Sequence, residues 1–178
     1  MHSRTQELLE YLDAQRAALR AAFDAVPPAE RDLAPAPGRW SAAHVIEHLA
    51  IVQGRMATIF SMKVAEGRAS GLGPETSTDP ILPTIDLAPA LDRTTRVAAP
   101  EMIQPTGTLD SNGAWAALER STAVFRAAVA EGDGLALSTM THRHSLFGPL
   151  SLYNWIALVG AHEARHAAQI RESLEVRT

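Results

Sequence analysis

The C-terminal stretch SLYNWIALVGAHEARHAAQIRESLEV, residues 151–176, carries the clearest structural signal in the chain. Its apolar residues recur at steps of three and four, which is the period of a helix with one face turned to a core. The positions in this series are Leu152, Trp155, Val159, His162, His166 and Ile170. We therefore expect a helix over residues 151–175 that places two histidines on its buried face.

These two histidines have the spacing of metal ligands. His162 and His166 are four residues apart, so on a helix they are separated by one turn along the axis and about 40° around it. A buried imidazole without partners leaves a donor and an acceptor unsatisfied, at a cost of about 1–3 kcal/mol each. A divalent ion between the rings would satisfy both lone pairs, so the pattern predicts a metal site.

Three further segments, residues 3–26, 41–66 and 111–131, also show a helical period. Their expected N-caps are Ser3, Ser41, and either Ser111 or Asn112. Prolines or glycines follow each segment and favour a helix end there. In the first segment Arg16 interrupts an otherwise apolar face.

The stretch from Arg68 to Asp110 contains six prolines, which is too many for a long helix. It offers one short candidate helix, Ala88 to Val97. Residues 135–146 lack a helical period and are expected to be a short extended segment or a loop that ends at Gly148-Pro149. We therefore predict an all-α fold, a four-helix bundle of one domain (residues 1–178) with a long crossover connection.

The composition disfavours several classes of protein. The chain has no cysteine, so a metal must take nitrogen or oxygen ligands. A net charge of −4 provides no basic footprint for nucleic acid. The N-terminus has no apolar signal region and no segment is long and apolar enough to span a membrane, so we expect a cytoplasmic protein with no membrane partner. Fifteen arginines beside one lysine suggest a bacterial source.

His48 is the expected third ligand, because it lies on the apolar face of the 41–66 segment. His44 lies one turn earlier, at the edge of this face, where a partly exposed polar role is more usual. His142 and His144 alternate, so in an extended chain they would point the same way. The roles of these three other histidines are left open, and a solvated loop pair is the usual outcome for the last two.

The motif His162-Glu163-Ala164-Arg165-His166 also matches the H-E-x-x-H helix of zinc proteases. The longer metzincin form requires a glycine and a histidine where this chain has Gln169 and Glu172. Glu163 points about 100° away from His162 around the helix. We interpret the match as a coincidence of spacing within a true metal-binding pair.

Several short motifs occur together in an order that resembles the DinB/YfiT-like superfamily. They are Trp40-Ser41, Glu47-His48-Leu49, Ala99-Pro100-Glu101, Pro105-x-Gly107, Phe147-Gly148-Pro149-Leu150 and His162-x-x-x-His166-x-x-Gln169-Ile170. The resemblance implies a bundle of up-down-down-up order, a homodimer, and one divalent ion on His48, His162 and His166. Characterised relatives include a transferase group and an isomerase that use low-molecular-weight thiols, and many members were described as metal-dependent hydrolases.

Three neutral histidines leave coordination positions open, which is typical of a catalytic metal site. Imidazole ligands favour zinc or nickel over magnesium. The leading hypothesis is a thiol-dependent transferase that acts on a small electrophile, and the alternatives are a hydrolase that uses metal-bound hydroxide and a non-catalytic metal-binding stress-response module. Glu47, Glu163 and Gln169 are candidates to orient a ligand or transfer a proton, although a solvent-facing position is more usual for the two glutamates.

Overall fold

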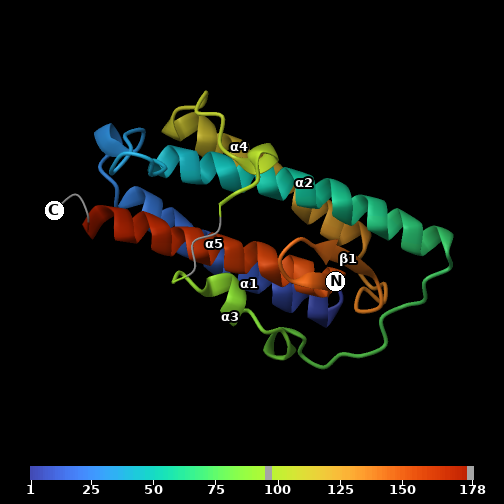
Figure 1. Cartoon of the computed structure of the whole chain (residues 1–178). Coiled ribbons are helices and arrows are strands. Elements are labelled where there is room, and N and C mark those ends of the chain that lie inside the picture. Colours follow the sequence, from blue (N-terminus) through green and yellow to red (C-terminus); the bar gives the residue numbers. More distant parts are fainter. Residues whose placement is uncertain (95–97, 176–178) are drawn as a thin grey trace.

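The computed structural model describes residues 1–94 and 98–175. Four long helices form the body of this part of the chain: α1 (Ser3–Asp24), α2 (Ala42–Ala69), α4 (Ser111–Glu131) and α5 (Leu152–Glu175). Helix α1 packs along α5, and α2 packs along α4 (Figure 1). The predicted all-α four-helix bundle is confirmed, with helix ends within three residues of those expected.

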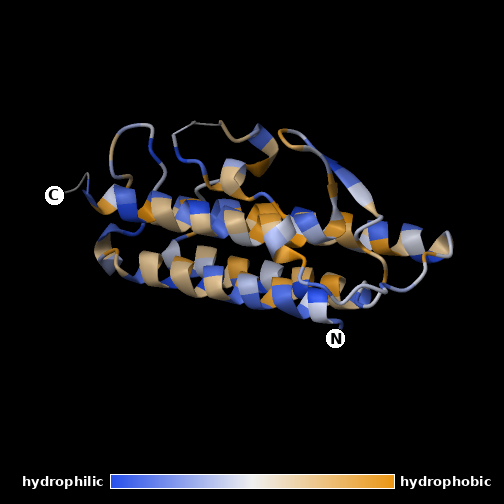
Figure 2. Cartoon of the chain, turned by 90° about the horizontal axis from the view of Figure 1, so that it is seen from below, coloured by the Kyte–Doolittle hydropathy of each residue, from blue (hydrophilic) through white to orange (hydrophobic). Residues whose placement is uncertain are grey.

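The core shows the direction of each helix. At one end it joins the C-terminal halves of α1 and α5 to the N-terminal halves of α2 and α4, through Leu19, Leu49, Leu118 and Ile170. At the other end the opposite halves meet, through Leu12, Phe60, Phe125 and Trp155. Helices α2 and α4 are therefore parallel, and the order is up-down-down-up. Hydrophobic and hydrophilic residues alternate along each helix (Figure 2), as amphipathic packing requires.

Because α2 and α4 are parallel, the chain between them must return along the bundle. This crossover contains η2 (Leu82–Thr84), α3 (Ala88–Leu91) and η3 (Glu101–Ile103), and it runs outside α5 and α1 before it reaches α2 again (Figure 1). The expected helix from Ala88 to Val97 ends at Leu91, so the prediction is wrong for residues 92–94, and residues 95–97 lie outside the described part. The carboxylate of Asp92 accepts a hydrogen bond from the Thr94 amide at 2.8 Å, a local turn that competes with the helix.

Two helix caps lie one residue earlier than predicted. His2, not Ser3, caps α1 through its ring nitrogen, and Asp110, not Ser111 or Asn112, caps α4 by accepting from the Gly113 amide at 2.7 Å. The prediction for Ser41 is confirmed, because its hydroxyl accepts from the His44 amide at 3.1 Å. An aspartate is at least as good an N-cap as a serine, so Asp110 takes this position.

One polar residue from each long helix fills the gap between the two apolar clusters. The four residues are Arg16, Gln53, Thr122 and Glu163, and we call them the polar layer. Arg16 donates from Nε and Nη2 to the two carboxylate oxygens of Glu163, at 2.8 and 2.6 Å. Arg16, which interrupts the apolar face of its helix, is thus the partner of a fully buried carboxylate.

The extended segment anticipated after residue 135 is the first strand of a hairpin, β1 (Thr141–His144) paired antiparallel with β2 (Gly148–Ser151). Residues 136–140 form a loop, as the alternative expected, but this loop ends before β1 and not at Gly148-Pro149, which begin β2. The Ser151 hydroxyl then accepts from the Asn154 amide at 3.2 Å, at the start of α5. Among the described residues, no helix is long and apolar enough to cross a membrane.

Candidate metal centre

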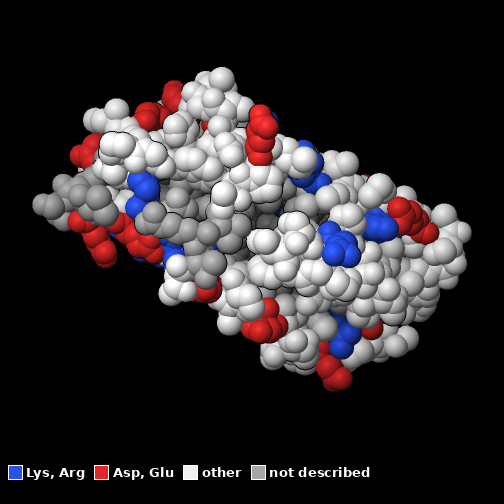
Figure 3. Space-filling model, viewed as in Figure 1, with Lys and Arg blue, Asp and Glu red and all other residues white. Residues whose placement is uncertain are grey.

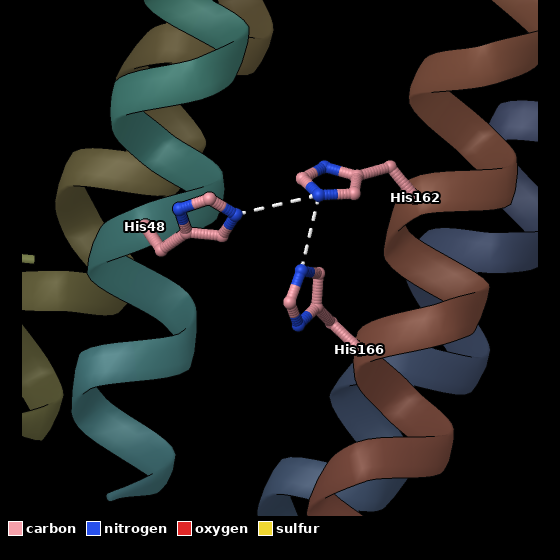
Figure 4. Close-up of side chains that lie close together, drawn as sticks. All are labelled: His48, His162 and His166. Atoms are coloured by element: carbon pink, nitrogen blue, oxygen red, sulfur yellow. Dashed lines mark hydrogen bonds between the residues drawn. The ribbon is translucent and has the colours of Figure 1, made fainter. Parts of the chain in front are cut away.

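The structure brings His48 of α2 together with His162 and His166 of α5 (Figure 4). The Nε2 atom of His162 lies 3.3 Å from Nε2 of His48 and 3.0 Å from Nε2 of His166. One ring nitrogen from each histidine lies within 4.8 Å of the other two. The side chains come from facing helices and point toward one another, which is how bundles build metal sites.

Hydrogen bonds outside the cluster determine which ring nitrogens carry protons. The carbonyl of Ile103 lies 2.6 Å from Nδ1 of His48, and the side-chain oxygen of Gln169 lies 2.8 Å from Nδ1 of His166. Both oxygens can only accept, so both Nδ1 atoms must donate. The Nε2 atoms of His48 and His166 therefore keep free lone pairs that are directed at His162.

A metal ion fits this arrangement better than hydrogen bonds do. Nε2 of His162 can donate one proton at most, and it faces two acceptors. Two nitrogens bound to a tetrahedral zinc at about 2.0–2.1 Å are about 3.3 Å apart, close to the 3.0 and 3.3 Å found here. The nitrogen donor set and the spacing are compatible with a divalent metal ion.

Burial keeps the three rings neutral. His48 and His166 are 3% and 6% exposed, while His162 is partly exposed. Desolvation lowers the pKa of His48, although the bond to Ile103 opposes the shift. Desolvation and then the nearby His48 lower the pKa of His162 to about 3, and desolvation with His162 holds the pKa of His166 well below its ordinary value. Neutral rings are the form that binds a metal.

The two glutamates proposed from the sequence occupy other positions than expected. Glu47 is 3% exposed and Glu163 is 0% exposed, so the expectation of solvent-facing side chains is wrong for both. Glu163 belongs to the polar layer, and Glu47 binds the crossover at Thr106 and Gly107. Each finds donors that compensate for burial of the charge, and this is the condition for burying a carboxylate.

The other histidines of the site region stay outside the cluster. His44 is partly exposed and completes the cap of α2, with its Nδ1 at 3.5 Å from the Ser41 amide. The rings of His142 and His144 both lie against Trp155, at 5.8 and 5.1 Å between centroids. The two hairpin histidines thus point the same way, as their alternation predicted.

The Ile103 carbonyl carried no sequence signal, and the buried partner of Arg16 could not be identified from the sequence. The Ile103 carbonyl is a backbone group, and nothing in the residue type indicates that it would reach His48 across 55 positions. Arg16 carried a signal, since a charged residue within an apolar face requires a buried partner. That partner, Glu163, is 147 residues away.

Comparisons with known proteins agree with this fold. The crystal structure of TT2238, a four-helix bundle protein, is similar over 96% of this chain and 98% of that chain, with a TM-score of 0.57 and 21% identity. At this identity the likeness concerns the fold alone. A search of curated proteins gave no match. A sequence model described as the DinB superfamily matches residues 11–170, a range that contains all three clustered histidines, and the chain therefore belongs to the DinB superfamily.

Proposed function

We propose that this protein is a metal-dependent enzyme in which His48, His162 and His166 hold one divalent ion, zinc or nickel, and that it transfers a low-molecular-weight thiol to a small electrophile. One observation carries the proposal: Nε2 of His162 lies 3.3 Å from Nε2 of His48 and 3.0 Å from Nε2 of His166, while Nδ1 of His48 and Nδ1 of His166 are held from outside the cluster. A site built only for packing would not direct lone pairs at one another.

The chemistry follows from the ligand set. A divalent ion on three neutral nitrogens keeps a net positive charge and open positions, which favours a thiol in its thiolate form. The chain has no cysteine, so the sulfur must arrive with a cosubstrate. Support for a thiol comes from the family resemblance, in which several relatives use thiols of this kind.

The surroundings of His162 offer a place for the electrophile. His162 is partly exposed, while His48 and His166 are buried, so a substrate would approach past His162. Trp155 precedes it on the same helix by seven residues, about two turns. Trp155 is buried, and the half-buried rings of His142 and His144 pack against it, so the electrophile would lie beside these histidine rings. Gln169 would hold the His166 ring in position through its 2.8 Å hydrogen bond.

The test is an activity assay of the metal-loaded protein against electrophiles with glutathione, bacillithiol or mycothiol, beside thiol-free esters and amides. The proposal expects turnover that needs both metal and thiol and that is lost in His162→Ala but kept in His2→Ala, whose histidine caps the first helix. Metal-dependent turnover without a thiol would favour a hydrolase. The absence of metal-dependent turnover across the panel would favour a non-catalytic binding module.

A further inference from the structure

A short segment of the crossover, residues 102–107, contacts the candidate metal centre at His48, and we call this segment the strap. It lies on the face of α2 that carries His44, Glu47, His48 and Arg55. At one end of the strap, Sδ of Met102 accepts from Nη2 of Arg55 at 3.1 Å. The face of the molecule drawn in Figure 3 carries acidic and basic side chains at separate places among uncharged residues.

Glu47 accepts three hydrogen bonds from the strap. Its Oε1 accepts from the amide and the hydroxyl of Thr106, at 3.1 and 2.5 Å, and its Oε2 accepts from the Gly107 amide at 3.0 Å. The partners that the structure gives this carboxylate are thus all N–H and O–H groups of the strap. A carboxylate that is 3% exposed needs such donors, so Glu47 and the strap stabilise each other.

The backbone conformation of the strap also fits its position against α2. Gly107 has a positive φ of 72°, a conformation that favours glycine. A Cβ at this position would lie 3.1 Å from Nε2 of His44, which is tighter than an ordinary contact. The backbone at Gly107 is therefore fitted between the His44 ring and the Glu47 carboxylate, so this end of the strap has little freedom to shift.

Ile103 lies in the strap four residues before Gly107, and its carbonyl oxygen lies 2.6 Å from Nδ1 of His48. This contact decides the tautomer of His48, because a carbonyl can only accept. The proton is held on Nδ1, and Nε2 is left with its lone pair directed at His162. If the strap moved away, the His48 ring would lose this partner and both neutral tautomers would become accessible.

We infer that Glu47 is a positioning residue of the metal centre: it anchors the strap so that the Ile103 carbonyl fixes His48 as the Nδ1–H tautomer with Nε2 free for the ion. The inference rests on the proposed function in one respect, that His48 binds the ion. Glu47 need not touch the ion or a substrate. It acts through the strap and through the hydrogen bond to His48.

The substitution Glu47→Gln tests this without creating a cavity. One terminal atom of glutamine is an NH2 group, so it cannot accept from both Thr106 and Gly107. Glu172→Gln is the matched control, since Glu172 ties another part of the crossover to α5 by accepting from Arg93 at 2.9 Å without contacting the strap. Thr106→Val is a milder second variant, because it removes the 2.5 Å hydroxyl contact and leaves both amide donors in place.

The measurement has two parts. In metal-free protein labelled with 15N at histidine, at a pH above the ordinary histidine pKa of about 6.5, long-range 1H–15N spectra give the tautomer of each ring. Competition with a chromophoric chelator then gives the Kd for zinc. We expect Glu47→Gln to shift His48 from the Nδ1–H tautomer toward a mixture of both neutral tautomers and to raise the Kd for zinc about 10–100-fold. Thr106→Val should cause a smaller shift. In Glu172→Gln the Kd for zinc should stay within about twofold of that of the unsubstituted protein.

A His48 ring that stays in the Nδ1–H form in Glu47→Gln, or an unchanged zinc Kd, would overturn the inference. If Glu47→Gln does not fold, by far-UV circular dichroism, the same criterion applies to Thr106→Val. If the unsubstituted protein binds no zinc or nickel, the proposed function fails. The tautomer of His48 in metal-free protein then still decides whether Glu47 positions this ring.

Discussion

Replacing Arg16 by methionine should destabilise the fold strongly, because it removes the cation from the polar layer. Arg16 bonds both oxygens of Glu163, at 2.8 and 2.6 Å, and its side chain is 18% exposed against 0% for Glu163. Removing one partner of a buried ion pair costs about 3–5 kcal/mol. Some water reaches Arg16, so we expect a loss near about 3 kcal/mol, a large part of the about 5–15 kcal/mol typical of a domain.

The charge left on Glu163 is the main source of this loss, and a second substitution can show it. In Arg16→Met with Glu163→Gln no buried charge remains, so the double variant should be more stable than Arg16→Met alone, by about 1–2 kcal/mol. Urea denaturation measures both values. Arg126→Met is the control, since Arg126 pairs with Asp13 at the surface and such pairs contribute about 0–1 kcal/mol. A loss below about 1 kcal/mol in Arg16→Met, or simple additivity in the double variant, would refute the argument.

Three further outcomes are expected from urea denaturation. Metal-free protein should lose stability as the pH falls below about 6.5, by about 1.4 kcal/mol per pH unit for each ring that stays neutral. The cause is that the pKa values of His48, His162 and His166 are lowered in the folded protein, so the unfolded chain binds protons first. A free energy of unfolding that does not change between about pH 6.5 and about pH 5 would contradict this. Zinc at 100 times its Kd should add about 2.7 kcal/mol at neutral pH, and a chelator should remove this gain. Gly160→Ala should lower the free energy of unfolding by about 1–3 kcal/mol, because the new Cβ would lie 2.6 Å from the Tyr11 ring. An unchanged stability would show that α1 and α5 pack less closely than described.

The sequence predicts the helices and the histidine cluster because both depend on helical period. The apolar series in α5 carries His162 and His166, and the series in α2 carries His48, so each histidine is placed on an inner face before the helices are packed. The parallel arrangement of α2 and α4 also needs a long connection, and the proline-rich segment after residue 68 is recognisable in the sequence as such a connection. Local patterns are sufficient at these positions.

The parts that the sequence does not predict depend on contacts between distant residues. Glu47 and Glu163 are expected at the surface because charged residues are rarely buried, yet both are buried because the strap and Arg16 reach them from 59 and 147 positions away. The β2 strand contains Gly148 and Pro149, which are typical of a loop, but a two-stranded hairpin has open edges on which a proline is tolerated. The caps shift by one residue because aspartate and histidine side chains compete with the serines beside them.

The central claim is that His48, His162 and His166 hold one divalent ion, and metal content per chain tests it most directly. The purified protein is loaded with zinc or nickel, freed of excess ion, and analysed by elemental mass spectrometry beside His48→Ala, His162→Ala, His166→Ala and His44→Ala, each checked for folding by far-UV circular dichroism. We predict one ion per chain in the unsubstituted protein and in His44→Ala, and a clear loss in each of the other three. Full metal content in His48→Ala together with a loss in His44→Ala would contradict the account.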